Sequence, residues 1–219
     1  MKTFNDFITE AASTGANVHM EHPEDNAVKS SHGFEHAMST MKAIHSHLTG
    51  KGGGSTHVSE KMDGSPAVVF GHHPNTGKFF VASKGAFNKS PKLNYSHEDI
   101  DKNHGHSPGL AKKLHTALEH LPKVAPKKGV YQGDYMHDQH EIHHTDHDIS
   151  FKPNTVRYHI KKDSPEYKKA TNSKMGIAVH TKYTGNPDHP ETMHASPLTS
   201  HSDFKHHSDV HIVPHETKL

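Results

Sequence analysis

Apolar residues recur along this chain at two spacings, one typical of helices and one typical of strands. Between residues 34 and 48 they fall three or four positions apart, which predicts a helix that Gly50 ends. The same spacing predicts a helix over residues 109–121, closed by Pro122, and a shorter helix over residues 165–170. We expect the apolar stripes of these helices to pack into a core.

Short runs rich in Val, Ile, Phe and Tyr, bounded by turn residues, predict strands between the helices. Two of these runs flank a turn at residues 74–77, so we expect them to form a hairpin. The predicted strands cover residues 57–59, 67–71, 78–82, 129–136, 149–152, 155–160, 174–183 and 209–213. Residues 88–108 show neither spacing and are expected to form a loop.

Length and composition indicate one domain with tails. The chain has 219 residues. We expect an N-terminal segment over residues 1–17, a domain over 18–185 and a segment rich in His and Pro over 186–219. Only 30% of the residues are hydrophobic and the mean hydropathy is −0.87, yet the apolar residues cluster into runs that can form a core. The 25 basic and 24 acidic residues nearly cancel, so no long-range attraction to nucleic acid follows from the net charge.

The residue types present also limit the chemistry. The absence of cysteine excludes disulfides and thiolate metal sites. No apolar run approaches the length of a membrane span, so no membrane partner is expected. Against a background of 28 histidines and one arginine, Arg157, the His-rich and acid-rich residues 140–148 have the composition of a Zn²⁺ or Ni²⁺ site. Because histidines occur throughout the chain, a solvated loop is the preferred interpretation of these residues.

The most informative stretch for function is residues 59–66, between two predicted strands. Residues 61–64 are Lys-Met-Asp-Gly, so an ammonium group and a carboxylate share one tight connection. Gly64 permits a sharp turn or a close approach of the backbone to a ligand. A lysine held near phosphates becomes a nucleophile when it is partly desolvated. The alternative is an exposed lysine beside a turn aspartate.

Residues 61–64 resemble the Lys-x-Asp-Gly motif of the covalent nucleotidyltransferases, which comprise ATP-dependent DNA ligases, RNA ligases and mRNA capping enzymes. The preceding Ser59 and Glu60 are most similar to RNA ligase adenylation domains. In that family the lysine attacks the α-phosphate of ATP or GTP, pyrophosphate leaves, and a lysyl-nucleotide remains. The resemblance implies that Lys61 is the nucleophile, that Asp63 assists it, and that Glu60 and Gly64 lie beside the nucleotide.

Two further stretches resemble later motifs of the same family. Ser83 and Lys84 follow the first hairpin, as a Ser/Thr and a basic residue do in the second motif, which implies that Lys84 binds phosphate. Gly133 and Asp134 end an apolar run, where the family has Gly-Glu in its third motif. Asp134 is one methylene shorter than that glutamate, and the resemblance implies that it binds the ribose or the metal.

The family also places an aromatic residue against the purine, after the third motif. Phe151 and Tyr158 are both candidates for this role, with core or edge packing as the alternative for each. The resemblance as a whole covers roughly residues 55–183, with the motifs in family order. It implies an α+β fold: a ligase-like nucleotidyltransferase core of antiparallel sheets flanked by helices, without an OB-fold domain.

The fourth and fifth motifs depart from the family pattern. The strand at residues 174–183 resembles the fourth motif, Glu-Gly-x-Val-x-Lys, but Met175 stands where the metal-binding glutamate is expected and His180 where a lysine is expected. The fifth motif, Lys-x-Lys, is not evident. Lys182 and Lys218 are its nearest substitutes, although neither has the spacing.

These features leave three function classes open. The first is an ATP-dependent nucleotidyltransferase of the RNA or DNA ligase type that forms lysyl-AMP on Lys61, with GTP as the alternative nucleotide. Mg²⁺ would neutralise the phosphates, and RNA or DNA ends would be the acceptors. The second is a nucleotide-binding or nucleic-acid-binding module that kept the fold and lost turnover, which the change at Met175 favours. The third is an internal protein of a phage head, which the N-terminus favours.

The N-terminal residues 1–12 form an amphipathic pattern with Phe4, Phe7 and Ile8 on one face. They resemble the capsid-targeting peptides of internal head proteins in large tailed bacteriophages, which are cut after Ile/Leu-x-Glu. Here that tripeptide would end at Glu10. The resemblance implies phage head proteins and a prohead protease as partners, and the host cytoplasm and the virion interior as locations.

We predict that deleting residues 1–10 leaves the fold and any nucleotide binding intact and abolishes incorporation into particles. An isolated helix shorter than ~12–15 residues is marginal in water, so this segment needs a docking partner. Assaying particles for the deletion variant checks its incorporation. The mass of the full-length chain after packaging gives a second check, because the packaged chain should begin at Ala11. Unfolding of the domain on deletion would instead show that the segment belongs to the core.

Overall fold

The computed structural model describes residues 25, 27–51 and 60–214. The chain divides into two compact units, residues 1–58 and 59–219, a different division from the one expected from composition. The predicted N-terminal helix, the strand at residues 57–59, Ser59 and Lys218 lie outside the described residues. The two units are described separately below.

In the first unit, helix α3 (Ser31–Leu48) confirms the helix predicted from residue 34. It begins earlier because Ser30 caps it, with the Ser30 hydroxyl accepting a hydrogen bond from the amide of Gly33 at 3.0 Å. The prediction that its apolar stripe packs into a core was wrong. Phe34 and Leu48 are 54% and 79% exposed. Among the described residues of this unit, α3 is the only complete helix or strand, so none of them forms a second layer against the stripe.

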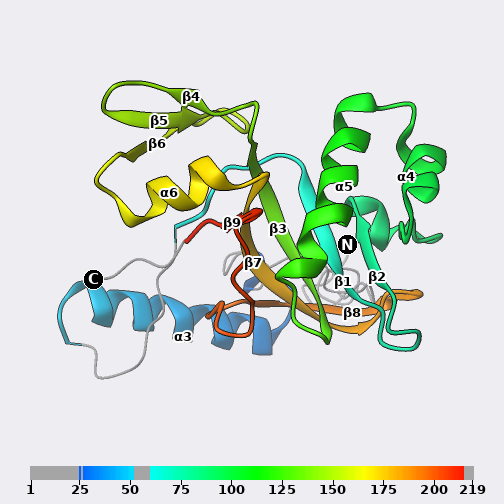
Figure 1. Ribbon diagram of the computed structural model, residues 1–219. Coiled ribbons are helices and arrows are strands. Elements are labelled where there is room, and N and C mark those ends of the chain that lie inside the picture. The colour runs from blue at the N-terminus through cyan, green and yellow to red at the C-terminus, as the bar shows by residue number, and fades with distance from the viewer. Residues whose placement is uncertain (1–24, 26, 52–59, 215–219) are drawn as a thin grey trace. The chain divides into compact units, whose positions relative to one another are not determined.

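The second unit is built on one large sheet and one small sheet (Figure 1). The large sheet has the strand order β2-β1-β3-β7-β8, all antiparallel, and β9 pairs with β7 in parallel. Its strands are β1 (Ala67–His72), β2 (Phe79–Ala82), β3 (Gly129–Asp138), β7 (Met175–Asn186), β8 (His189–Pro197) and β9 (Val210–Ile212). The small sheet consists of β4 (His143–His144), β5 (Asp148–Phe151) and β6 (Tyr158–Lys161). The expected α+β class with antiparallel sheets is therefore confirmed.

Helices flank these sheets, as Figure 1 shows for α5 beside the large sheet and α6 beside β9. They are α4 (His97–His104), α5 (Pro108–His120) and α6 (Pro165–Asn172), with short 3₁₀ turns η1 (Lys84–Phe87) and η2 (Leu121–Lys123). The loop expected over residues 88–108 was wrong, because α4 lies within it. This helix is held by a capping box between Ser96 and Asp99 and buries Ile100 and His104, so it has no apolar stripe to reveal it.

The two faces of the large sheet carry different cores. On one face, Val68 and Phe70 of β1 pack with Leu114 of α5 and with the other residues of the main apolar cluster. On the other face, Met136 of β3 and Phe151 of β5 form a smaller cluster, against which Met62 packs. The residue after Lys61 is therefore part of the contact that joins the small sheet to the large one.

The connection that leads into β1 follows β3 closely. The amide of Ser65 donates to the carbonyl oxygen of Tyr135 at 3.0 Å, and the amide of Tyr135 donates to the carbonyl oxygen of Pro66 at 2.9 Å. A Cβ on Gly64 would lie 2.5 Å from the Cβ of Asp134. Side chains never approach this closely, so only glycine fits here, and the sequence-based expectation of a close backbone approach at Gly64 holds against β3.

We predict that Gly64→Ala destabilises the second unit by about 1–3 kcal/mol, because the added methyl group overlaps β3. The melting temperature should fall by roughly 2–4 °C per kcal/mol. Gly109→Ala is the matched control, since a Cβ at Gly109 meets nothing within 4 Å. Differential scanning calorimetry of both variants checks this, and equal melting temperatures would contradict the packing argument.

Candidate functional site

Asp63 fixes the lysine-bearing connection to the turn between β5 and β6. Its carboxylate accepts hydrogen bonds from the side chain of Asn154 at 2.8 Å and from the hydroxyl of Thr155 at 2.6 Å. The backbone amides of Thr155 and Val156 donate to it at 3.1 and 3.3 Å. The Thr155 hydroxyl and the Asn154 amide are the main reasons that the pKa of Asp63 falls to about 2. This carboxylate therefore stays ionised at neutral pH, and its two oxygens accept hydrogen bonds from residues 154–156.

Tyr158 of β6 holds the backbone of the same connection. Its hydroxyl accepts a hydrogen bond from the amide of Asp63 at 2.6 Å, and its ring stacks on Phe151 with centroids 5.7 Å apart. Phe151 is 1% exposed, with the ring of His137 4.6 Å away, so it has no open ring face for a purine. Of the two aromatic candidates, Tyr158 alone is partly exposed.

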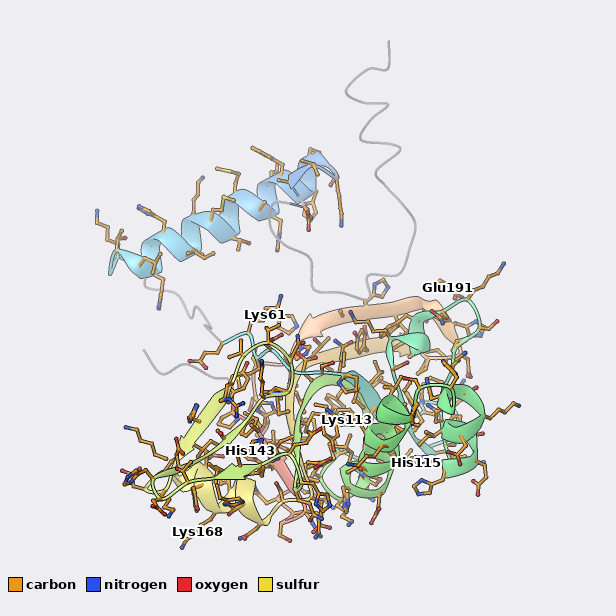
Figure 2. The ribbon with its side chains drawn as sticks, turned by 90° about the horizontal axis from the view of Figure 1, so that it is seen from above. Lys61, Lys113, His115, His143, Lys168 and Glu191 are labelled. Carbon is orange, nitrogen blue, oxygen red and sulfur yellow. The ribbon has the colours of Figure 1, made fainter. Side chains whose placement is uncertain are left out.

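Lys61 and Glu60 precede this anchored segment and are exposed. Figure 2 shows Lys61 at the surface of the second unit. Within the part of the chain that the structure describes, Lys61 makes no hydrogen bond and no ion pair. The amine of Lys61 therefore has no described partner, whereas the backbone at Asp63, two residues later, is held by the hydrogen bonds of that residue.

Asp134 lies on β3 beside this connection, and its side chain faces His180 of β7. The Nε2 of His180 is 3.6 Å from the Oδ1 of Asp134, and the two side chains are 26% and 20% exposed. His180 reaches this position because β7 bulges between Val179 and Thr181, where the register against β3 shifts. A bulge depends on the pairing of two strands, so the sequence indicated His180 only as a departure from a motif.

Lys84 begins η1 at the end of β2 and is exposed. Ala82 pairs with Val69, and Ala67 pairs with Asp134, so Lys84 follows β2 at the level of the Ala67–Asp134 pair. Strands lie ~4.8 Å apart, which places the start of η1 on the order of 10 Å from Asp134 across β1. The structure thus brings Lys61, Lys84 and Asp134 to one end of the large sheet.

The later motif residues lie elsewhere. Met175 is fully buried in the main apolar cluster and pairs with Asp138, whereas Ala178 pairs with Asp134. Met175 therefore does not occupy a position open to a metal ion beside Asp134. Lys182 pairs with Tyr131 of β3. Side chains alternate along a strand, so Tyr131 and Asp134, three positions apart, point to opposite faces of the sheet. Lys182 therefore lies on the face away from Asp134.

Lys113 of α5 supports the connection and was not found from the sequence. Its ammonium donates to the carbonyl oxygen of Ser65 at 3.1 Å, forms an ion pair with Glu141 at 3.4 Å and lies 5.0 Å from the centre of the Tyr135 ring. In the sequence, Lys113 is one polar position of an amphipathic helix, so nothing in that pattern distinguishes it from its neighbours.

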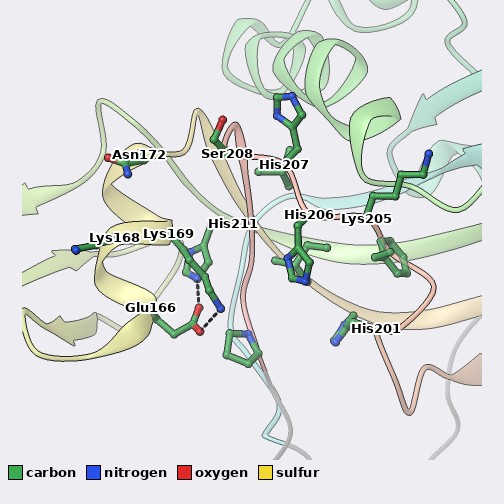
Figure 3. Close-up of a pocket in the computed structure, with 14 residues that line it drawn as sticks. Glu166, Lys168, Lys169, Asn172, His201, Lys205, His206, His207, Ser208 and His211 are labelled. Carbon is green, nitrogen blue, oxygen red and sulfur yellow. Dashed lines mark hydrogen bonds and ion pairs between the residues drawn. The ribbon is translucent and has the colours of Figure 1, made fainter.

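One cavity lies beside this site and a second cavity adjoins it, the two sharing Glu166, His211 and Pro214. The first has about 430 Å³ and is lined by Met62 and Tyr158, together with Ile160, Val213 and polar residues of β6 and α6. The second has about 520 Å³, and its lining includes lysines and histidines from α6, from the segment before β9 and from β9 itself (Figure 3). We call them the tyrosine cavity and the basic cavity.

A buried chain of hydrogen bonds runs inward from the shared wall. The Nε2 of His211 is 2.9 Å from the carboxylate of Glu166, and its Nδ1 is 3.2 Å from the Nε2 of His137. A neutral His211 that donates from Nε2 to Glu166 has an unprotonated Nδ1, which accepts a hydrogen bond from Nε2 of His137. The Nδ1 of His137 then has no partner in the described structure. The ring of His137 lies on Gly176, where a Cβ would come within 2.2 Å of it.

These contacts shift two pKa values in the same direction. The hydrogen bond from His211 is the main reason that the pKa of Glu166 falls to about 2. Burial, with His211 nearby, lowers the pKa of His137 to about 3. At neutral pH the chain therefore holds an ionised Glu166 and a neutral His137.

Residues 140–148, for which a solvated loop was the preferred interpretation and a metal site the alternative, lead through β4 into a short hairpin with β5. His143 and His144 are exposed on β4, and Asp148 accepts from the Thr145 hydroxyl and contacts Nδ1 of His159 at 2.7 Å. Among the residues that the structure describes, no three His, Asp or Glu side chains converge as metal ligands. In the same residues, every helix is too short or too polar to cross a membrane.

Fold and site together define an α+β domain in which a lysine-bearing connection is anchored between two antiparallel sheets. The chain belongs to a family of unknown function, DUF6267, whose model matches residues 17–219. The match begins beyond most of the predicted N-terminal segment. No curated protein and no solved structure matches the chain.

We predict that the buried imidazole makes the folded state less stable as the pH falls. Below pH 6.5 the unfolded chain protonates His137, while the folded chain with its pKa of about 3 does not, so stability is lost between pH 6.5 and pH 3. This one group should contribute a loss of about 2 kcal/mol between pH 7 and pH 5. Urea unfolding should show this loss in the wild type and a correspondingly shallower pH slope in His137→Gln.

His143→Gln is the control, because His143 is exposed on β4. Its unfolding free energy should keep the pH slope of the wild type. Equal slopes for the wild type and for His137→Gln would contradict the buried neutral imidazole.

Proposed function

We propose that this chain is a nucleotidyltransferase of the ligase type, in which Lys61 accepts a nucleoside monophosphate from ATP. The observation that carries the proposal is the contact of Gly64 with Asp134, which leaves no room for a Cβ. It holds the connection that bears Lys61 against the strand that bears the carboxylate. The resemblance of residues 61–64 to the family motif supplies the chemistry.

The reaction needs a free amine, a bound α-phosphate and a leaving group. The Nζ of Lys61 forms a bond to phosphorus, the bond from the α-phosphorus to the bridging oxygen breaks, and pyrophosphate leaves with that oxygen. The amine loses a proton to solvent in the process. Lys61 suits this role because its side chain is exposed and has no described ion-pair partner that would hold it away from a bound phosphate.

Other side chains would position the nucleotide. The tyrosine cavity begins at Met62, next to the nucleophile, and offers the ring of Tyr158 to a purine. Lys84 supplies positive charge for the phosphates from the end of β2. Asp63 acts by positioning, since its four hydrogen bonds fix the backbone beside Lys61.

The family chemistry also implies Mg²⁺. Mg²⁺ in nucleotide sites is commonly held by one or two carboxylates together with substrate phosphates. Asp134 fits this mode, because it is a partly exposed carboxylate whose described contact is His180 at 3.6 Å. Bound there, the ion would neutralise charge on the phosphates.

A module that binds nucleotide without turnover is the second candidate. The observation that favours it is the buried position of Met175, since the strand aligned with the fourth motif offers no carboxylate beside Asp134. Such a module would bind the purine in the tyrosine cavity and form no covalent product.

We predict that incubation with α-labelled ATP and Mg²⁺ leaves one label on Lys61, through an acid-labile phosphoramidate bond. Lys61→Ala should abolish the label, and Lys61→Arg should also fail because a guanidinium stays protonated. Intact-mass spectrometry of each protein measures the added nucleoside monophosphate, and peptide mapping locates it.

Lys102→Ala is the matched control, since Lys102 is an exposed lysine of α4, outside the site. It should label as the wild type does. Absence of label from both ATP and GTP, with purine binding retained, would replace the enzyme with the binding module.

A further inference from the structure

The basic cavity concentrates positive charge in a chain whose total charge is close to zero. Its lining brings together Lys168 and Lys169 of α6 with Lys205, His206 and His207 from the segment before β9 (Figure 3). These two groups are about forty residues apart in the sequence, so the charge is gathered by the fold. The formal charge of the whole chain is only +1, so the net charge gives no indication of this local cluster of basic side chains.

The cavity has one acidic side chain in its lining, and that charge is already neutralised. Glu166 accepts from Lys169 at 2.8 Å and contacts His211 at 2.9 Å. The side chain of His211 is fully buried, so its contact with Glu166 holds this wall of the cavity from the protein interior. The side chains of Lys168 and Lys205 make no hydrogen bond and no ion pair with any described residue and remain exposed, which leaves two ammonium groups open to a ligand.

The cavity's other polar groups suit phosphate oxygens. Asn172 and Ser208 add neutral hydrogen-bond donors to the lysines and histidines. The volume of about 520 Å³ exceeds what a single phosphate group fills, and the neighbouring tyrosine cavity adds an aromatic ring at Tyr158. A basic surface beside an accessible aromatic ring is the combination by which proteins hold single-stranded nucleic acid without base selection, and Tyr158 is a partly exposed ring of this kind.

We propose that the basic cavity binds backbone phosphates of a single-stranded nucleic acid, through Lys168 and Lys205. The choice of a nucleic-acid strand as the ligand rests on the proposed function, in which strand ends are the acceptors. The cavity anchors a part of the strand away from Lys61, and so supplies affinity without taking part in the transfer.

The test compares two matched double variants by fluorescence anisotropy, with a labelled twelve-nucleotide oligo-U RNA and the corresponding oligo-dT as probes. Lys168→Gln with Lys205→Gln should weaken binding roughly tenfold at low salt, and should reduce the slope of log affinity against log salt by about 1.4. Lys102→Gln with Lys127→Gln removes the same charge from exposed lysines outside the cavity and should change binding less than about twofold.

Equal weakening in both double variants would overturn the proposal, because binding would then follow net charge alone. Displacement of the probe by equimolar ATP, with the same dependence on Lys168 and Lys205, would also overturn it and make the cavity a mononucleotide site. Lys61→Ala separates the two proposals, since it should bind the strand as the wild type does. If the wild type takes no label but its strand binding depends on Lys168 and Lys205, only the proposed transfer is refuted. If the wild type takes the label and the cavity variant binds the strand as the wild type does, only this inference is refuted.

Discussion

The close contact between residues 64–66 and β3 is the constraint on which the candidate site depends. Gly64 has no space for a Cβ beside Asp134, and the backbone of Ser65 and Pro66 extends the pairing of β1 with β3. One residue earlier, Asp63 is bonded to the turn between β5 and β6. A short segment thus joins the two sheets, and the position of Lys61 follows from both attachments.

This arrangement separates the roles of the lysine and the aspartate in residues 61–64. A neighbouring carboxylate could hold Lys61 in an ion pair, but the oxygens of Asp63 are engaged by residues 154–156. The low pKa of Asp63, about 2, reflects those bonds and makes the carboxylate a poor proton acceptor. Asp63 therefore serves the site through geometry, and the amine is left to solvent or to a ligand.

The sequence predicted the strands and the α5 helix well, because their apolar spacing is local and regular. It could not predict the bonds between Asp63 and Thr155, which lie 92 residues apart and leave no periodic pattern. The helix α4 was missed because polar caps stabilise it, and β8 was missed because its residues are largely polar and exposed. In the structure, Lys61, Lys84 and Asp134 lie at one end of the large sheet, a placement that depends on strand pairing and is not visible in the sequence. Met175 does not join them because it is buried in the main apolar cluster and pairs with Asp138, and Lys182 does not because the bulge in β7 puts it on the other face of the sheet from Asp134.

The large number of histidines has two separate physical consequences in this structure. Buried imidazoles such as His137 stay neutral, so they add no charge and lower stability under acid conditions. Exposed imidazoles such as His206 and His207 line the basic cavity beside lysines, and Nδ1 of His207 lies 3.7 Å from Asp209, a carboxylate whose pKa is lowered mainly by its hydrogen bond from Lys123. An imidazole gains its charge near neutral pH, whereas an arginine is charged throughout. Arg157 is the chain's only arginine and is not among the residues that line this cavity, so Lys168, Lys169 and Lys205 supply the permanent positive charge that the cavity presents to a polyanion.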